Sequence, residues 1–192
     1  MKHAATGLDR VLVVGTTGCG KSTLAARLAQ LLGSRFVDLD DLNWRPGWRQ
    51  APLRELRAQV AAAAAAERWT MAGNYRTVRD LTLARCQTVI FLDYPLPVVF
   101  TRLVGRTFRR AVRREVICNG NRENLLEHFF SRDSLLLWCL RTHRRRGREY
   151  RALTARPEPP HLRVLRFTTP WQTARWLARL AAEGVAPPAA IP

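Results

Sequence analysis

The chain has 192 residues, of which 47% are hydrophobic, and it carries 32 basic against 15 acidic side chains. This composition predicts one domain with a sizeable core. The net charge of +17 predicts either a polyanionic partner or arginines that hold the phosphates of a small substrate. No apolar run is long enough to span a membrane, and the start MKHAATGLDR lacks the apolar core of a signal peptide. The four cysteines form no C-x-x-C pair, so we expect reduced thiols, a cytoplasmic location and no membrane partner.

Five short apolar segments alternate with helix-forming stretches along the chain. We expect strands at 11–14, 35–39, 69–73, 88–93 and 162–167. We expect helices at 21–32, at 52–68, after Pro97, through the basic region to Arg156, and from a Thr169 cap to Gly184. Because apolar strands that alternate with helices form parallel sheets covered on both faces, we expect an α/β fold. Residues 1–192 should form a single domain with a frayed Pro- and Ala-rich tail at 185–192.

The stretch GTTGCGKS, residues 15–22, directly follows the first strand and opens the first helix. Its glycines let backbone N–H groups point inward around an anion, and the helix adds its positive end there. Lys21 can reach β- and γ-phosphates, and the Ser22 hydroxyl can hold Mg²⁺. Lys21 is one of only two lysines in an arginine-rich chain, the other being Lys2. This pattern favours an ATP site over a glycine-rich turn without a ligand. The candidate nucleotide-binding residues are Gly15, Thr16, Thr17, Gly18, Cys19, Gly20, Lys21, Ser22 and Thr23.

Cys19 lies inside this loop, next to the start of the helix. A helix N-terminus lowers the pKa of a nearby thiol and makes it reactive. We therefore expect alkylation of Cys19 to block ATP binding and bound Mg·ATP to protect the thiol.

Seven motifs together carry a resemblance that extends from residue 11 to about 180. They are GTTGCGKST (15–23), DLDDLNWRPGW (38–48), WTMAGNYR (69–76), VIFLDYP (89–95), RLVGR (102–106), NGNRE (119–123) and HLRVLRFTTP (161–170). With them the chain resembles the adenylate-kinase-like small P-loop kinases, and within these the topology modulation protein or putative adenylate kinase group. The resemblance implies a three-layer P-loop NTPase fold, a five-stranded parallel sheet of order 2-3-1-4-5, and a helical lid, which we place at 107–132.

Three aspartates end predicted strands at the edge where open α/β sheets bind ligands. Asp38 and Asp40 point to the same side of their strand, and the resemblance implies that an acid here faces the acceptor or Mg²⁺. Asp40 is our candidate catalytic acid; the alternative is that Asp38, Asp40 and Asp41 form a capping cluster for the following loop. Relatives carry an acid where this chain has Ala72, so ordering of Mg²⁺ should fall to Asp38, Asp40 or Asp93. The candidate metal ligands are Ser22, Asp38 and Asp93.

The other candidate residues come from three later motifs. Gly73, Asn74 and Arg76 follow the third strand, where the resemblance implies an acceptor site, and Arg76 either clamps an acceptor phosphate or is solvated. Arg102 and Arg106 lie four residues apart and hence on one helix face. The resemblance implies that the first stacks on adenine and the second contacts the phosphates, so both are candidate catalytic residues. Thr169 lies where related kinases place the loop beneath the adenine, but it could instead serve only as a helix cap.

Three classes of function remain compatible with these residues. The first is an ATP- and Mg²⁺-dependent phosphotransferase, in which a nucleoside monophosphate acceptor is slightly favoured over a hydroxyl-bearing metabolite. The alternative is a nucleic-acid-associated P-loop ATPase that uses the arginines between Arg102 and Arg151 as a phosphate tract. The third is a nucleotide-binding regulator without efficient turnover, for which Ala72 is the only hint. In each case we expect a monomer or a weak dimer.

Overall fold

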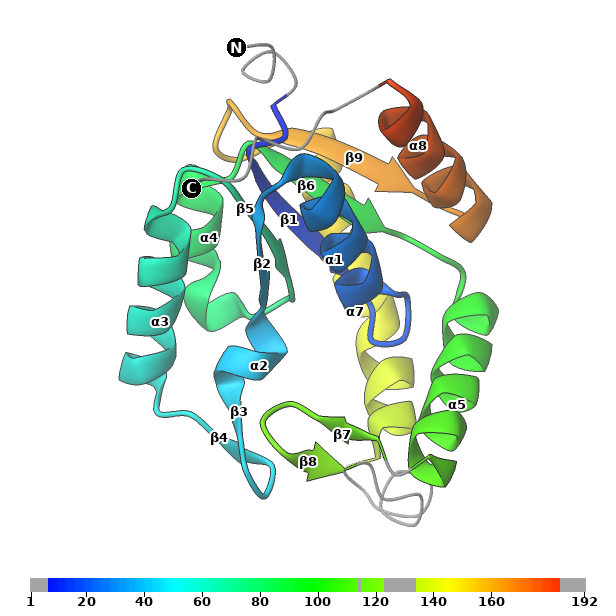
Figure 1. Cartoon of the computed structure of the whole chain (residues 1–192). Coiled ribbons are helices and arrows are strands. Elements are labelled where there is room, and N and C mark those ends of the chain that lie inside the picture. Colours follow the sequence, from blue (N-terminus) through cyan, green and yellow to red (C-terminus); the bar gives the residue numbers. More distant parts are fainter. Residues whose placement is uncertain (1–6, 114, 123–133, 184–192) are drawn as a thin grey trace.

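The centre of the molecule is a five-stranded parallel sheet. The computed structural model describes residues 7–113, 115–122 and 134–183. The sheet comprises β1 (Arg10–Gly15), β2 (Arg35–Asp38), β5 (Trp69–Ala72), β6 (Thr88–Leu92) and β9 (Arg163–Phe167). Its strand order is β2-β5-β1-β6-β9, and every pairing in it is parallel (Figure 1). This confirms the predicted order 2-3-1-4-5 when the five sheet strands are counted along the chain.

Helices cover both faces of the sheet, which confirms the three-layer α/β fold (Figure 1). They are α1 (Lys21–Leu32), α2 (Leu39–Asn43), α3 (Leu53–Ala65), the 3₁₀ turn η1 (Arg76–Val78), α4 (Arg79–Arg85), α5 (Leu96–Val112), α7 (Leu135–Ala155) and α8 (Pro170–Ala182). One core cluster joins α3, α4 and the end of α7 to one face of the sheet. A second joins α1, α5, α8 and the start of α7 to the other face. None of the helices within the described ranges is long and apolar enough to cross a membrane.

The apolar run of β1 follows from its position in the middle of the sheet. Leu12 and Val14 belong to one core cluster, whereas Val11 and Val13 belong to the other. A strand that is buried on both faces needs apolar residues at every position, which explains an uninterrupted run. Its carboxyl end then delivers Gly15 to the edge of the sheet, where the candidate site begins.

The structure differs from the sequence prediction after β2 and after β5. The strand expected at 35–39 ends at Asp38, because Asp38 caps the short helix α2. After α2 the chain forms a small hairpin of β3 (Trp44–Arg45) and β4 (Arg49–Gln50), which the sequence analysis did not predict. Helix α4 was also missed.

The lid expected to be helical at 107–132 needs a correction. Helix α5 continues to Val112, but the chain then forms a second hairpin of β7 (Val116–Ile117) and β8 (Asn121–Arg122). The turn residues Cys118, Asn119 and Gly120 have φ of 40°, 62° and 92°, which no right-handed helix allows. The Asn-Gly pair is a typical hairpin signal. Residues 123–132 of the expected lid and the tail expected at 185–192 lie outside the described residues.

Candidate functional site

The loop 15–20 wraps around a point at the carboxyl end of β1. Gly15, Gly18 and Gly20 have φ of 148°, 90° and 99°. A Cβ at Gly18 would lie 2.8 Å from the Leu103 Cβ, and a Cβ at Gly15 would lie 2.7 Å from the Leu92 carbonyl oxygen. Both positions therefore require glycine. Gly20 is the N-cap of α1 and supplies no side chain there, so the N–H groups of the first helical turn face the inside of the loop.

Lys21 and Asn74 close this loop from two sides. The Lys21 Nζ donates to the Thr16 carbonyl oxygen at 3.4 Å, which holds the ammonium group over the loop. The Asn74 Oδ1 accepts from the Gly15 N–H at 3.1 Å, and the Asn74 amide also donates to the Gly15 carbonyl oxygen. Asn74 was expected to contact the acceptor, but in the structure it braces the phosphate loop.

Cys19 does not lie in the environment that the sequence analysis expected. Its side chain is fully buried in the core cluster with Leu103 and Tyr94. Burial raises the pKa of the Cys19 thiol, although the charges of Lys21 and Arg102 act in the opposite direction. The prediction of a reactive thiol is therefore wrong. The helix N-terminus is close, but the thiol points into apolar surroundings where a thiolate is costly.

Helix α7 packs against the phosphate loop, which the sequence analysis missed. The His143 Nδ1 lies 3.1 Å from the Thr16 Oγ1, and the Cys139 thiol donates to the Thr17 carbonyl oxygen at 3.6 Å. Burial lowers the pKa of His143, which favours the neutral imidazole that can share a hydrogen bond with a hydroxyl. These contacts join residues more than 120 positions apart, so no local pattern in the sequence announces them.

Asp38 and Ser22, two of the three candidate metal ligands, meet beside the phosphate loop. The Ser22 hydroxyl hydrogen-bonds the Asp38 carboxylate, which also accepts from the Asp40 N–H at 3.0 Å. Burial, followed by the negative charge of Asp40, raises the pKa of Asp38. The capping interpretation is thus also correct for Asp38, which is the N-cap of α2. Because burial disfavours the charged form of Asp38, a nearby cation would stabilise its carboxylate.

Asp40 projects from the first turn of α2 and is held by Tyr75. The Tyr75 hydroxyl donates to the Asp40 Oδ1 at 2.6 Å. Burial and the negative charge of Asp40 raise the pKa of Tyr75, so the phenol stays protonated and keeps donating. Gly73 lies between these groups, and a Cβ there would be 2.7 Å from the Leu39 Cβ, so the glycine is needed for α2 to pack. Tyr75 was not a candidate, although GNYR was among the motifs.

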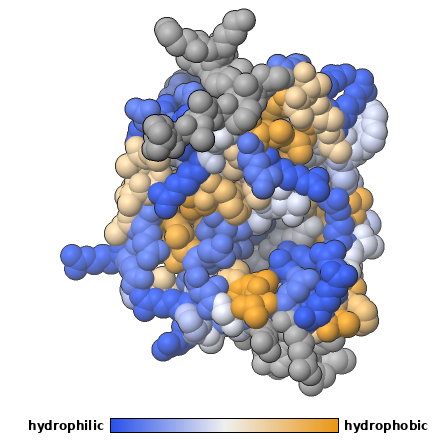
Figure 2. All heavy atoms as spheres, viewed as in Figure 1, coloured by the Kyte–Doolittle hydropathy of each residue, from blue (hydrophilic) through white to orange (hydrophobic). Residues whose placement is uncertain are grey.

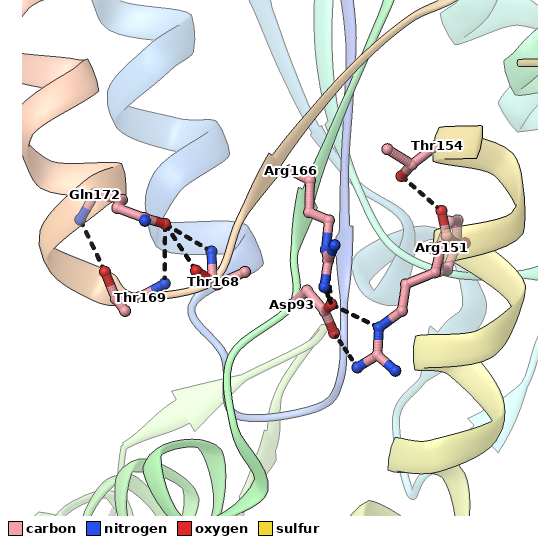
Figure 3. A network of polar contacts seen from close by, with 8 residues as sticks. Asp93, Arg151, Thr154, Arg166, Thr168, Thr169 and Gln172 are labelled. Atoms are coloured by element: carbon pink, nitrogen blue, oxygen red, sulfur yellow. Dashed lines mark hydrogen bonds and ion pairs between the residues drawn. The ribbon is translucent and has the colours of Figure 1, made fainter.

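Asp93 is engaged by two arginines, which argues against the predicted metal role. Its carboxylate accepts from Arg151 at 2.8 and 3.0 Å and from Arg166 at 2.8 Å (Figure 3). Only 3% of the Asp93 side chain is exposed. Burial acts to raise the pKa of Asp93, but the hydrogen bonds from Arg151 and Arg166 outweigh it and hold the pKa below its usual value. A cation would have to displace two guanidinium groups, so we assign Asp93 a structural role that ties β6 to α7 and β9.

The remaining candidates occupy the rim of the same edge. The Arg102 Nη1 donates to the Cys19 carbonyl oxygen at 3.3 Å, and its guanidinium lies 5.7 Å from the centre of the Tyr94 ring. Arg106 follows one turn later in α5. Arg76 is exposed at the start of η1. Thr169 makes a complete capping box with Gln172, visible in Figure 3, which confirms its structural role.

The phosphate loop, Lys21 and the Ser22–Asp38 pair lie together at one edge of the sheet. Figure 2 shows that the face in view is hollowed in its middle, between the strands and the two small hairpins seen in Figure 1. Among the described residues, no group of three or more His, Cys, Asp or Glu side chains could hold a metal by itself. Proteins bind Mg²⁺ through one or two carboxylates, water and substrate phosphates. Ser22 and Asp38 provide such an incomplete set.

Comparison with known proteins supports the fold and points to one class of relatives. No protein-family model matches the chain. It is similar to shikimate kinase 2 of Sodalis glossinidius, with 38% identity over 62 residues that cover 32% of this chain and 30% of that protein. It is also similar to shikimate kinase of Synechococcus elongatus, with 31% identity over 126 residues that cover 58% of this chain and 66% of that protein. The chain thus spans less than two thirds of these curated relatives.

Among solved structures, a gluconokinase from Sinorhizobium meliloti 1021 matches with a TM-score of 0.51 and 20% identity, covering 92% of this chain and 95% of that one. This likeness establishes the shared fold. The finer resemblance to the topology modulation protein group stays a prediction.

Proposed function

We propose that this protein is an ATP-dependent phosphotransferase that moves the γ-phosphoryl group of ATP to a hydroxyl group of a small metabolite. One observation carries the proposal: the phosphate loop with Lys21, the Ser22–Asp38 pair and the Asp40–Tyr75 pair all lie at the same edge of the sheet. Phosphoryl transfer requires these three elements, namely a phosphate cradle, a place for Mg²⁺ and a group that orients the attacking hydroxyl.

The phosphate side of the site has clear chemical roles. The N–H groups of loop 15–20 and the Lys21 ammonium hold the β- and γ-phosphates and neutralise charge that shifts during transfer. Ser22 and Asp38 would hold Mg²⁺, which when bound shields the phosphate oxygens from the attacking group. Asn74 and His143 keep the loop in this shape through Gly15 and Thr16.

In the proposed reaction Asp40 acts on the acceptor. Its carboxylate can accept the proton of the acceptor hydroxyl while the hydroxyl oxygen forms a bond to the γ-phosphorus and the bond from that phosphorus to the bridging oxygen breaks. ADP then leaves with the electron pair of the broken bond. Tyr75 donates to one Asp40 oxygen at 2.6 Å, which fixes the orientation of the carboxylate.

The preference between the two acceptor classes is corrected relative to the sequence analysis. A nucleoside monophosphate needs a cationic clamp, and its candidate, Arg76, is exposed at the start of η1. A carboxylate held by Tyr75 instead suits a neutral hydroxyl. The curated relatives with 31% and 38% identity are shikimate kinases, whose named acceptor is a hydroxyl-bearing small molecule. We therefore place a hydroxyl metabolite ahead of a nucleotide acceptor.

The nucleic-acid-associated ATPase remains the second candidate because of one surface groove. It lies between β9 and α8 and combines aromatic with cationic side chains, and the Arg175 guanidinium lies 5.1 Å from the centre of the Trp171 ring. Arginines beside exposed aromatic rings suit stacking on single-stranded nucleic acid. The lining residues are Arg166, Phe167, Trp171, Gln172, Arg175, Trp176 and Arg179.

A turnover screen tests the proposed function. The purified protein is mixed with Mg·ATP and a panel of shikimate, other small hydroxy acids, sugars and nucleoside monophosphates, and acceptor-dependent ADP release is measured. Phosphorylation of a hydroxyl compound, absent in a Lys21→Ala variant, supports the proposal. Phosphorylation of nucleoside monophosphates alone would return the preference to the first acceptor class. ADP release that depends only on added nucleic acid would favour the second candidate.

A further inference from the structure

The two small hairpins lie side by side at the open end of the site (Figure 1). The β3–β4 hairpin follows α2, whereas the β7–β8 hairpin follows α5. The residues in contact are more than 70 positions apart in the chain: Asn119 and Asn121 of the second hairpin bind main-chain groups of α2 and of the first hairpin. The motif NGN at 119–121 thus binds α2 and the β3–β4 hairpin, and the proposed reaction assigns these contacts no role.

Asn121 is buried and uses its amide group fully. Its Nδ2 donates to the Arg45 carbonyl oxygen at 3.0 Å and to the Cys118 carbonyl oxygen at 2.6 Å. Its Oδ1 accepts from the Trp48 N–H at 2.9 Å. Only 4% of the residue is exposed. A buried amide that satisfies both donors and its acceptor fixes the relative position of the two hairpins.

Asn119 reaches further back, to α2. Its Nδ2 donates to the Asp41 carbonyl oxygen at 2.6 Å and to the Trp44 carbonyl oxygen at 2.7 Å. Helix α2 ends at Asn43, and carbonyl groups at a helix end lack partners within the helix. Asn119 supplies a donor for one of them. Asp38 caps the other end of this five-residue helix, and a helix that short depends on such contacts.

We propose that Asn119 and Asn121 are positioning residues, which couple the placement of the β7–β8 hairpin to the orientation of Asp40 at the acceptor end of the site. This inference rests on the proposed function, because it assumes that Asp40 receives the acceptor hydroxyl. Asp40 lies in α2 between its Asp38 cap and the carbonyl group of Asp41 that Asn119 binds. When the hairpin is docked, α2 is held at both ends. When it is undocked, the C-terminal end of α2 loses the two hydrogen bonds from Asn119, whereas the Asp38 cap and the Tyr75 contact remain.

The charge distribution agrees with this placement. Burial, and then the negative charges of Asp40 and Asp41, raise the pKa of Cys118 to about 12. The turn of the β7–β8 hairpin is therefore close enough to the acids of α2 to feel their charge.

Asn119→Gly is the sharpest variant. Asn119 has φ of 62°, which glycine adopts without strain, and the side chain is exposed, so the change removes the donor and leaves the backbone intact. We expect kcat/KM for the acceptor to fall on the order of tenfold, as for the loss of two modest hydrogen bonds, while the affinity for Mg·ATP is unchanged. Val116→Ala, on an exposed residue of the same hairpin, is the matched control and should leave both values unchanged.

Hydrogen exchange provides a readout that does not need turnover. In the parent protein the Trp48 N–H is bound by Asn121, so segment 41–50 should exchange slowly. Asn119→Gly and Asn121→Ala should accelerate its exchange without a change in the rest of the sheet. Faster exchange together with a lower acceptor kcat/KM supports the proposal.

The contradicting outcomes are distinct. Unchanged exchange in both variants shows that the two hairpins are not joined in solution and overturns the inference. Faster exchange with an unchanged acceptor kcat/KM shows that the asparagines join the hairpins without affecting catalysis, and this result also overturns the inference. A parent protein that is protected at 41–50 but phosphorylates no hydroxyl compound refutes the proposed function, and the coupling to Asp40 falls with it.

Discussion

At the scale of single residues, function concentrates in a few polar groups whose neighbours limit what they can do. Cys19 and Asp93 illustrate this. Each has the residue type that its expected role requires, yet burial disables the Cys19 thiol and two arginines engage the Asp93 carboxylate. The Lys21 ammonium group, by contrast, donates to the Thr16 carbonyl oxygen at the long distance of 3.4 Å. A phosphate oxygen can replace this carbonyl oxygen as the acceptor.

Lys21→Ala should abolish phosphoryl transfer and leave the fold intact, because the ammonium group has a charge role in a loop and no role in the core. We expect a loss of at least about 100-fold in kcat, on the scale of removing one preorganised donor. Lys21→Arg should also fail, since a planar guanidinium does not fit a cradle formed around a compact charge. Acceptor-dependent ADP release and urea unfolding measure the two effects. Activity within tenfold of the parent, at comparable stability, would contradict the assignment.

Arg106→Ala should lower turnover more than it raises the KM for ATP, if Arg106 neutralises charge in the transition state. We expect a loss of about 2–4 kcal/mol in transition-state stabilisation. Arg109→Ala, an exposed residue of the same helix, is the control and should behave like the parent. If both variants lose activity equally, general positive charge on α5 is responsible and Arg106 has no specific role.

At the scale of elements, helices and strands are joined by side chains that no local pattern reveals. Helix α7 contacts the phosphate loop through His143 and Cys139, and it contacts the end of β6 through Arg151. Helix α8 begins with a capping box that is readable in the sequence. Long-range contacts such as those of α7 decide where a helix lies in the fold. A local capping box such as that of α8 decides only at which residue a helix begins.

The Asp93 network should stabilise the protein in a pH-dependent manner. Because its folded pKa lies below the usual value, the contribution of Asp93 is present above the pKa of the unfolded chain and is lost as pH falls through the folded pKa. We expect Asp93→Asn to cost about 2 kcal/mol at pH 7, less than a fully buried pair because both arginines are partly exposed. Urea unfolding at pH 7 and near pH 3 should show a smaller gap between variant and parent in acid. A gap of equal size at both pH values would argue against the ion pairs.

Thr169→Ala separates the two roles left open for this residue. Loss of the cap should lower the free energy of unfolding by about 1 kcal/mol. Because the Thr169 side chain is engaged with the Gln172 N–H at 3.2 Å, the KM for ATP should not change. Thr169→Ser keeps the cap and is the matched control. A raised KM for ATP in Thr169→Ala alone would show that the hydroxyl also contacts the nucleotide.

At the scale of the whole molecule, two sets of arginines are relevant to the two candidate functions. Some arginines face the site, as Arg102 does through the Cys19 carbonyl, whereas Arg175 and Arg179 lie in the groove beside α8. A kinase needs only the first set, and a nucleic-acid-dependent ATPase needs the second.

Substitutions in the α8 groove should therefore leave phosphoryl transfer unchanged and affect only binding of nucleic acid. We expect the double variant Trp171→Ala, Arg175→Ala to retain the acceptor kcat/KM of the parent. Titration of a single-stranded probe at two salt concentrations measures the other function, in which each lost arginine removes about one released counterion from the salt slope. Tight, salt-sensitive binding by the parent that stimulates ATP hydrolysis, and that the double variant loses, would favour the second candidate function.

The local features of this protein follow from its sequence alone, because they depend on neighbouring residues. The apolar run of β1, the glycines of loop 15–20, the capping box at Thr169 and the alternation of strands and helices all have short-range causes. Together with the motif resemblance they were sufficient to predict the parallel sheet, its strand order and the phosphate loop.

Only the tertiary structure decided which polar groups meet. Asp38 joins Ser22, Asp40 joins Tyr75 and Asp93 joins two arginines, although the sequence alone placed all three aspartates at strand ends. The turn at 118–120 forms a hairpin that reaches α2, where the family resemblance implied a helical lid. The physical reason is that the energy of a polar side chain depends on its burial and on its partners, and residues distant in the chain supply both.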